Sequence, residues 1–160
     1  MTAVSPVDFR HFKLGDETAF RELNEAWIAA NFVVEQEDLK ALKDPVGYIL
    51  RPGGALVMAF QDGIAVGTCA LLAMGNGIFE VAKMTVAERC RGMGIGKQLL
   101  QRVIDHATLI GAKRLYLETN KKLRSAIHLY ESAGFRHLRA EEVHPSPYVR
   151  ANVFMEMVLS

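Results

Sequence analysis

The chain has 160 residues, half of them hydrophobic and 23% charged, with 19 lysines and arginines against 18 aspartates and glutamates. This composition is typical of a globular protein with one core and excludes a disordered or fibrous chain. The balanced charge gives no indication of nucleic-acid binding, so any recognition of an anion must be local.

The first half of the chain predicts a strand, two helices and an antiparallel meander. A strand over 7–12 precedes a helix that Asp16 can cap, whose apolar residues fall at helical spacing: Phe20, Leu23, Trp27 and Ala30. A second, acidic helix runs over about 35–43 and stops near Pro45. Three strands joined by glycine-containing turns follow, over 55–61, 64–74 and 78–86.

The second half predicts a strand–helix–strand crossover. A helix is indicated by Gly111 just past its end and by the apolar stripe Ile95, Leu99, Val103, Ala107 and Ile110. The strand over 114–119 follows at once, which requires a parallel pair and therefore a mixed sheet. A helix over 124–133 ends at Gly134, and two further strands cover 135–138 and 153–159. The pattern thus predicts one α/β (α+β) domain over 1–160, with about seven strands and about four helices.

The most informative segment is the glycine-rich turn Arg91-Gly92-Met93-Gly94-Ile95-Gly96-Lys97, which joins the end of a strand to the start of a helix. Glycines let the backbone approach a ligand, free N–H groups point outward, and the helix dipole adds positive potential. Arg91 and Lys97 add charge on either side. We therefore expect an anion here, and the alternative is a tight turn that needs glycine only for its dihedral angles.

Two other nucleotide-binding patterns fit this turn less well. A P-loop is excluded because Arg91 stands in place of its first glycine and Gln98 in place of its magnesium-binding hydroxyl. The dinucleotide pattern begins at Gly92, and Glu118 ends the next strand where a ribose-binding acid would sit, but Lys97 occupies the third glycine position. The antiparallel strands before the turn also have no place in a parallel nucleotide-binding half. A nicotinamide-dependent oxidoreductase remains the less favoured enzyme.

The pattern [RQ]-x-x-G-x-[GA] is met by Arg91, Gly94 and Gly96, and it belongs to the GNAT superfamily of N-acetyltransferases, which this sequence resembles. Also similar to that superfamily are the strands over 79–86 and 115–120 and the stretch Ala126-Ile127-His128-Leu129-Tyr130-Glu131-Ser132-Ala133-Gly134-Phe135. The resemblance covers nearly the whole chain. It implies the GNAT fold, acetyl-CoA as co-substrate, no metal, and direct acetyl transfer to an amine without a covalent intermediate.

The same resemblance implies how acetyl-CoA is held. Backbone groups of Met84, Thr85 and Val86 would bind the thioester end and pantetheine, and the turn over 91–97 would hold the pyrophosphate. A backbone N–H near Met84 would stabilise the oxyanion that forms on attack. One departure is visible, because Leu123 stands where many relatives have an asparagine that contacts pantetheine. That contact would fall to one of two nearby polar residues, Asn120 or Ser125.

Acetyl transfer to an amine poses two proton-transfer problems. An alkylamine, with a pKa of about 10.4, must lose a proton before it attacks, and the departing thiolate gains from an acid. By the resemblance, Glu80 would be the base, acting through water, and Tyr130 the acid, with Glu118 as a reserve base. Each has a simpler interpretation: Glu80 as a strand residue facing water, and Tyr130 as a packed ring whose hydroxyl is satisfied.

The acceptor amine is expected between the first two helices and the late loop. The loop supplies His144, Tyr148 and Arg150, and the second helix supplies the carboxylates of Glu35, Glu37 and Asp38. These carboxylates would attract a cationic amine, although a merely solvated acidic face is the alternative. Whether the amine is a small molecule, a protein N-terminus or a lysine stays open, as does a homodimer. A second class of function, a non-catalytic module that binds or senses acyl-CoA, would carry the same glycine-rich turn.

The cysteines and the apolar segments bear on the compartment. Cys69 and Cys90 have neither C-x-x-C spacing nor the density of a secreted disulfide framework, which indicates free thiols. No signal-peptide pattern begins the sequence, and the longest apolar stretch, over 64–74, is too short to span a bilayer. We therefore expect a cytoplasmic protein without a membrane or nucleic-acid partner.

Overall fold

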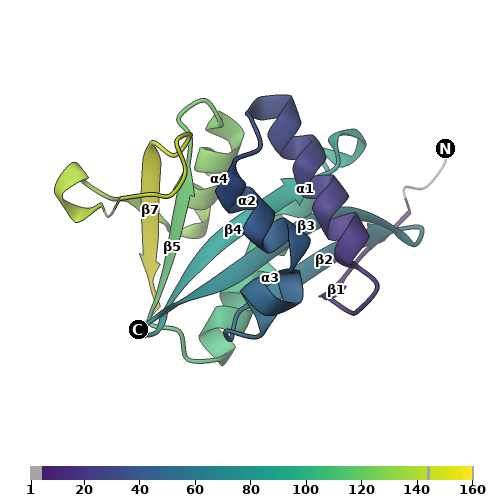
Figure 1. Cartoon of the computed structure of the whole chain (residues 1–160), viewed down its shortest axis with the longest axis horizontal. Helices are drawn as coiled ribbons and strands as arrows, with labels where there is room; N and C mark the ends of the chain where they lie inside the picture. Colours follow the sequence, from purple (N-terminus) through teal and green to yellow (C-terminus); the bar gives the residue numbers. More distant parts are fainter. Residues whose placement is uncertain (1–4, 144, 160) are drawn as a thin grey trace.

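The computed structural model describes residues 5–143 and 145–159, and its centre is a seven-stranded sheet in the order β1-β2-β3-β4-β5-β7-β6 (Figure 1). Only β4 and β5 pair in parallel, so the sheet is mixed as predicted. The strands are β1 (Val7–His11), β2 (Ala55–Gln61), β3 (Ile64–Gly75), β4 (Ile78–Val86), β5 (Arg114–Thr119), β6 (Arg136–His137) and β7 (Val153–Val158).

Four α-helices accompany the sheet, which confirms the predicted fold class: α1 (Glu17–Asn31), α2 (Gln36–Lys43), α3 (Ile95–Leu109) and α4 (Arg124–Ala133). Three short helical segments were not predicted: the π-helix η1 (Val46–Leu50) and the 3₁₀ turns η2 (Glu88–Cys90) and η3 (Ala140–Glu142). Among the described helices, none combines the length and apolar character needed to cross a membrane.

The sheet has a core on each face, because successive side chains of a strand point to opposite sides. Leu56 and Met58 of β2 are fully buried in a cluster with α1, α2 and η1, while their neighbour Val57 packs with α3 on the other face. Figure 1 shows α1 and α2 in front of the sheet and α3 behind it. Glu80, on the central strand β4, therefore lies between two helical layers.

The buried stripe of α1 differs from the predicted one. Phe20, Asn24 and Ile28 are buried, whereas Leu23 and Trp27 are only partly so. The sequence pattern did not identify Asn24, because the buried face was predicted from apolar residues alone. Its Nδ2 donates to the carbonyl of Phe20 at 2.9 Å and to Thr68 Oγ1 at 3.2 Å, which satisfies the buried amide.

The start of α1 also differs in detail from the expected cap. Asp16 occupies the N-cap position, but its side chain makes no capping hydrogen bond to α1. Its carboxylate instead accepts hydrogen bonds from Arg10 Nη1 at 2.7 Å and from the Lys13 amide at 2.8 Å. Asp16 thus ties the end of β1 to the turn before α1.

A β-bulge separates the two parallel strands. Thr68 pairs with Thr85 and Ala70 with Ala82, so Lys83 and Met84 together oppose one residue of β3. Lys83 has a left-handed φ of +53°, which is rare for a residue with a side chain. The parallel pairing of β4 with β5 ends at Glu80 opposite Tyr116. A bulge bends its strand, so the ends of β4 and β5 diverge and leave a wedge between them.

Candidate active site

The wedge between β4 and β5 opens into a pocket of about 910 Å³. Its walls come from both strands, from α1, from the first half of α3, from α4 along most of its length, and from the loop around Tyr148 and Arg150. Met93 is not among its lining residues and is 38% exposed. All other predicted site residues line it: Glu80, Met84, Thr85, Val86, Arg91, Gly92, Gly94, Ile95, Gly96, Lys97, Asn120, Ser125 and Tyr130.

The first turn of α3 presents unpaired backbone amides to this pocket. Gly94 is the N-cap in a left-handed conformation, and its side chain cannot cap the helix. The first backbone bond of α3 runs from Gln98 N to Gly94 O at 3.2 Å, so the amides of residues 95–97 have no partner within the helix. The first turn of α3 also contains no acidic residue. Such a helix end favours an anion.

The three glycines of the turn serve two different purposes. Gly92 and Gly94 have φ angles of +80° and +77°, and a Cβ on either would meet no atom within 4 Å. Their backbone conformation alone therefore explains them. Gly96 has an ordinary φ, and its Cβ would lie 3.6 Å from Leu129 Cδ2 and 3.8 Å from Val86 Cγ2. Since Gly96, Leu129 and Val86 all line the pocket, a side chain at Gly96 would occupy pocket space.

Polar groups along the pocket differ in their freedom to bind a ligand. Thr85 Oγ1 is buried without a hydrogen-bond partner in the described part of the chain, which is a costly state unless a ligand or water supplies one. Asn120 is engaged on both sides, since Nδ2 donates to the Arg150 carbonyl at 2.7 Å and Oδ1 accepts from the Lys122 amide at 3.0 Å. Ser125, in the exposed first turn of α4, is better placed to contact a ligand than Asn120.

Glu80 is not the water-facing strand residue of the simpler interpretation. It is partly buried in the pocket wall, where β4 and β5 stop pairing. Burial, reinforced by the negative charge of Glu118, raises the pKa of Glu80 to about 7, against a smaller opposing effect of Lys83. A carboxylate with this pKa can accept a proton near neutral pH.

Glu118, the reserve base, is already engaged. Its Oε2 accepts a hydrogen bond from the Tyr116 hydroxyl at 2.8 Å, and its Oε1 accepts one from the Ser146 hydroxyl at 2.5 Å. Since both of its oxygens already accept hydrogen bonds, Glu118 is less free than Glu80 to contact a ligand.

Tyr130, on α4, also lines the pocket. It is 8% exposed, and its ring packs edge-on against Phe135 with ring centroids 6.0 Å apart. Phe135 folds back onto α4 through its amide, which donates to the Tyr130 carbonyl at 3.0 Å. Burial raises the pKa of the Tyr130 hydroxyl. The hydroxyl is therefore protonated at neutral pH and can donate a hydrogen bond or a proton.

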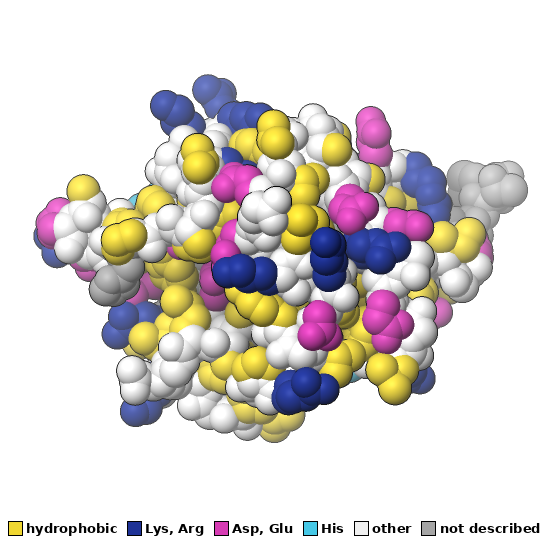
Figure 2. Space-filling model, in the orientation of Figure 1, with side chains coloured by type: hydrophobic (Ala, Val, Ile, Leu, Met, Phe, Trp, Pro, Cys, Tyr) yellow, Lys and Arg dark blue, Asp and Glu magenta, His cyan; other side chains and the backbone are white. Residues whose placement is uncertain are grey.

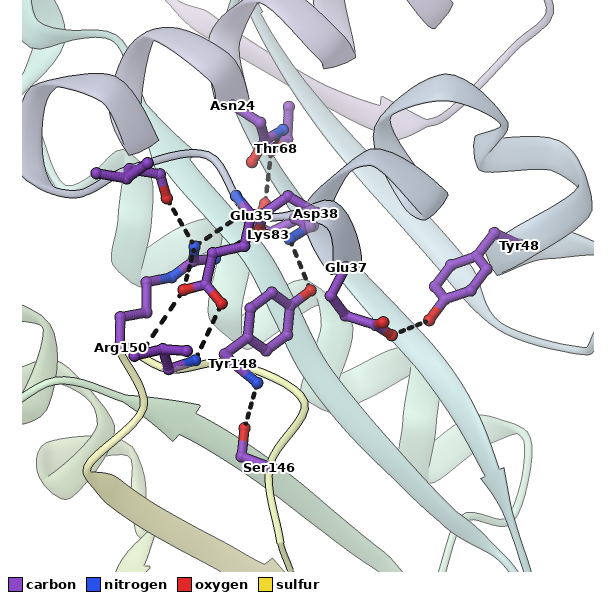
Figure 3. Close-up of polar contacts among 12 residues, drawn as sticks. Asn24, Glu35, Glu37, Asp38, Tyr48, Thr68, Lys83, Ser146, Tyr148 and Arg150 are labelled. Atoms are coloured by element: carbon purple, nitrogen blue, oxygen red, sulfur yellow. Dashed lines mark hydrogen bonds and ion pairs between the residues drawn. The ribbon is translucent and has the colours of Figure 1, made fainter.

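The carboxylates of α2 are paired with cations, which corrects the expectation that they attract an amine or merely face water. Figure 3 shows Asp38 between Lys83 and Arg150. Its carboxylate accepts a hydrogen bond from Lys83 Nζ at 2.7 Å and two from the Arg150 guanidinium, at 2.8 and 2.5 Å. Glu35 lies 3.5 Å from Arg150 Nη1 and accepts the Val149 amide at 3.0 Å, and Glu37 pairs with Lys40 at 2.6 Å. Over α1 and α2, side chains of both signs lie next to one another (Figure 2). His144 of the late loop lies outside the described residues.

The pKa of Asp38 shows how strongly Lys83 and Arg150 stabilise its negative charge. Asp38 is fully buried, which by itself would raise its pKa, but hydrogen bonds from Arg150 and Lys83 lower the pKa to about 2. The sequence offered no signal for this pairing, because Asp38 and Arg150 are 112 positions apart. Lys83 was not predicted as a site residue, yet it lines the pocket beside Glu80.

The two cysteines remain single thiols in the structure. Cys69 and Cys90 are free and buried, which confirms the prediction of unbridged thiols. Burial raises the pKa of the Cys69 thiol to about 12. Within residues 5–143 and 145–159, no three His, Cys, Asp or Glu side chains gather as a metal site.

Comparisons with known proteins converge on one family. The family model described as "Acetyltransferase (GNAT) family" matches residues 17–135. N-acetylaspartate synthetase of Rattus norvegicus is 37% identical over 101 residues, 62% of this chain and 34% of the relative. The N-acetyltransferase YjgM of Escherichia coli is 36% identical over 91 residues, 55% of this chain and 54% of the relative. The chain thus spans about a third to a half of the length of these curated relatives.

Solved structures share the fold over nearly the whole chain. An acetyltransferase of the GNAT family from Staphylococcus aureus has a TM-score of 0.89 at 24% identity, covering 97% of this chain and 100% of that one. A phosphinothricin acetyltransferase from Sinorhizobium meliloti, solved in complex with acetyl-CoA, has a TM-score of 0.78 at 20% identity, covering 96% and 88% of the two chains.

Proposed function

Because the chain belongs to the acetyltransferase (GNAT) family, we propose that it transfers an acetyl group from acetyl-CoA directly to an amine, with Glu80 as base and Tyr130 as acid. One observation carries the proposal: a carboxylate with a pKa near 7 and a buried, protonated phenol line the same pocket as the unpaired amides of α3. Anion site, proton acceptor and proton donor are the three parts that acyl transfer to an amine requires.

The residues of the pocket suit acetyl-CoA from one end to the other. The amides of residues 95–97, with Arg91 and Lys97 beside them, would hold the pyrophosphate. Backbone groups of Met84, Thr85 and Val86 would bind pantetheine, because β4 has no partner from β5 beyond Glu80. The orphaned Thr85 hydroxyl and the exposed Ser125 hydroxyl are available for side-chain contacts, and Ser125 takes the role left by Leu123.

In the proposed reaction, the ammonium group of the acceptor loses its proton to Glu80, directly or through water. The free amine attacks the thioester carbonyl, so that a C–N bond forms and the C–S bond breaks. Tyr130 donates its proton to the departing thiolate. The second proton of the former ammonium group then passes to the tyrosinate and restores Tyr130, and Glu80 releases the first proton to solvent. No covalent enzyme intermediate is needed. This is consistent with Cys90 being buried to 1% exposure and with the high pKa that burial gives Cys69.

Two alternatives carry less support. A module that only binds acyl-CoA would have no use for a carboxylate whose pKa is raised to about 7 in the same pocket as a buried tyrosine. A nicotinamide-dependent oxidoreductase would require a parallel nucleotide-binding half, whereas β1 to β4 form an antiparallel meander.

The deciding experiment combines binding and turnover. Acetyl-CoA should raise the melting temperature, with a stabilisation of about 2.7 kcal/mol at 100 times its dissociation constant, and NAD or ATP at equal concentration should not. A thiol reagent should then detect free CoA when amines are added. Stabilisation by NAD alone would contradict the proposal, and binding of acetyl-CoA without turnover by any amine would leave the binding module as the better description.

A further inference from the structure

Two cations, Lys83 and Arg150, line the pocket together with the carboxylate of Glu80. Lys83 and Glu80 lie close enough that the charge of each shifts the pKa of the other. The carboxylates that balance the cations lie behind them: Asp38 is fully buried, and neither Asp38 nor Glu35 lines the pocket. A ligand in the pocket therefore meets the cations of Lys83 and Arg150 as well as the carboxylates of Glu80 and Glu118.

Both cations are held in fixed positions. Asp38 binds Lys83 Nζ at 2.7 Å and takes two hydrogen bonds from the Arg150 guanidinium. The ring of Tyr148 lies under both, with Lys83 Nζ 5.1 Å and the Arg150 guanidinium carbon 4.6 Å from its centroid (Figure 3). The Tyr148 hydroxyl also accepts a hydrogen bond from Lys83 at 3.2 Å. Groups fixed in advance lose little conformational entropy when they bind a ligand.

Donor capacity remains on both side chains. The Lys83 ammonium has three N–H groups, and Asp38 and Tyr148 take two of them. The Arg150 guanidinium has five, and its recorded bonds to Asp38 and to the Val33 carbonyl use three. The remaining donors are of the kind that bind a carboxylate.

Given the acetyl transfer proposed above, we infer that the acceptor is a free α-amino acid. Its carboxylate binds Lys83 and Arg150, and its amine faces Glu80. An α-amino acid carries its two charged groups on one carbon, which matches a cationic pair next to a base. A polyamine fits poorly, because its second ammonium would meet Lys83 and Arg150. The apolar wall formed by Trp27, Ile28 and Phe32 of the α1 segment leaves space for an amino-acid side chain.

The test compares free amino acids with their own amides as acceptors, by release of CoA. An α-amine without a neighbouring carboxylate has a pKa of about 8, so an amide supplies more free amine at pH 7.5 than the parent acid. Without carboxylate recognition, the amide must therefore be the better acceptor. We expect the opposite: at least one free amino acid should exceed its amide in kcat/KM by about tenfold or more, as for loss of a charge-assisted contact.

Two variants separate recognition from a structural role. Arg150→Gln should raise KM for the free acid about tenfold or more and leave the amide within about threefold, whereas Arg150→Lys should keep part of the preference. Arg139→Gln removes a charge from a side chain that is 73% exposed and should change neither substrate. Equal losses for acid and amide in Arg150→Gln, with a lower melting temperature, would mean that the cluster only holds α2 to the late loop, and the inference would be wrong.

The remaining outcomes distinguish this inference from the function on which it rests. If simple amines or amides release CoA as fast as every free amino acid, the acceptor class is wrong and acetyl transfer stands. If acetyl-CoA binds but no amine of any class releases CoA, both the acceptor class and the enzyme assignment fail.

Discussion

Thr68 Oγ1 donates a hydrogen bond of 2.6 Å to the carbonyl oxygen of Lys83, the residue whose left-handed backbone forms the bulge of β4. The same hydroxyl accepts the Nδ2 of Asn24 at 3.2 Å. One buried hydroxyl thus connects α1, β3 and the bulge that opens the pocket. A left-handed conformation costs a residue with a side chain about 1–2 kcal/mol, so the bulge depends on such contacts to persist.

The first prediction concerns this link. Thr68→Val keeps the shape of the side chain but removes the hydrogen bond to the Lys83 carbonyl and leaves one N–H of the Asn24 amide, whose other bond goes to Phe20, without its buried partner. We expect a loss of about 1–3 kcal/mol in the free energy of unfolding, measured by urea denaturation. Thr68→Ser keeps the hydroxyl and is the control, since it should lose only the methyl contribution. Equal stability of Thr68→Val and the parent would mean that the bulge is maintained without the hydroxyl.

The second prediction concerns Gly96, where a Cβ would make only ordinary van der Waals contacts but would extend into the pocket. Gly96→Ala should fold at least as stably as the parent, because alanine favours a helix. The added methyl enters pocket space, so the dissociation constant of acetyl-CoA, measured by calorimetry, should rise about tenfold or more, as expected for overpacking.

The matched control for Gly96→Ala is Gly111→Ala. Gly111 has a φ of +80°, lies in open space and does not line the pocket, so alanine there should lower stability and leave acetyl-CoA affinity unchanged. Gly94 is a poorer test site, because its φ of +77° strains any side chain whatever the ligand requires. Parental affinity in Gly96→Ala would place the ligand away from the first turn of α3.

The third prediction gives Glu80→Gln opposite effects on activity and stability. Activity of the parent should rise with pH through about 7, as Glu80 loses its proton, and Glu80→Gln should lose this dependence. The variant should recover in part at high pH, where the amine ionises without a base. A uniform loss at every pH would indicate positioning rather than proton transfer.

The effect of Glu80→Gln on stability follows from the same raised pKa. The folded protein holds the Glu80 proton up to pH about 7 and the unfolded chain only to about 4.5, so the parent loses stability as the pH rises between these values. Glutamine carries no charge. Glu80→Gln should therefore gain about 1–3 kcal/mol over the parent at pH 8, and the gain should vanish below about pH 4.5. Urea denaturation at the two pH values measures this difference.

Local patterns allowed most of the fold to be predicted from the sequence. Helical periodicity and glycine positions located α3 and the turn at Gly94, because both depend on neighbours within a few residues. The α1 register was harder, since Asn24 is buried through a partner in β3, 44 positions away. The part of the pocket around Lys83 and Arg150 was hard to predict for the same reason, because it depends on residues far apart in the sequence. Neither the left-handed backbone of Lys83 nor the pairing of Asp38 with Arg150 has a local signature, so the acidic stretch was misinterpreted as free carboxylates.

The last prediction tests Tyr130, because Tyr130→Phe keeps the ring that packs against Phe135 and removes only the hydroxyl. If the hydroxyl protonates the departing thiolate, kcat should fall by about a hundredfold or more, in the range of a lost general acid. The dissociation constant of acetyl-CoA should hardly change, since an interaction made only in the transition state does not contribute to ground-state binding.

Damage to packing would give a different result from loss of an acid. It would lower the melting temperature and change the dissociation constant together with kcat, although no sizeable cavity is expected when one oxygen is removed. Slow release of CoA could hide a modest chemical defect, so the comparison requires single-turnover kinetics with an acceptor for which chemistry limits the rate. If well-folded Tyr130→Phe protein transfers acetyl within about threefold of the parent under these conditions, water or the acceptor itself must protonate the thiolate, because loss of a general acid costs far more than that.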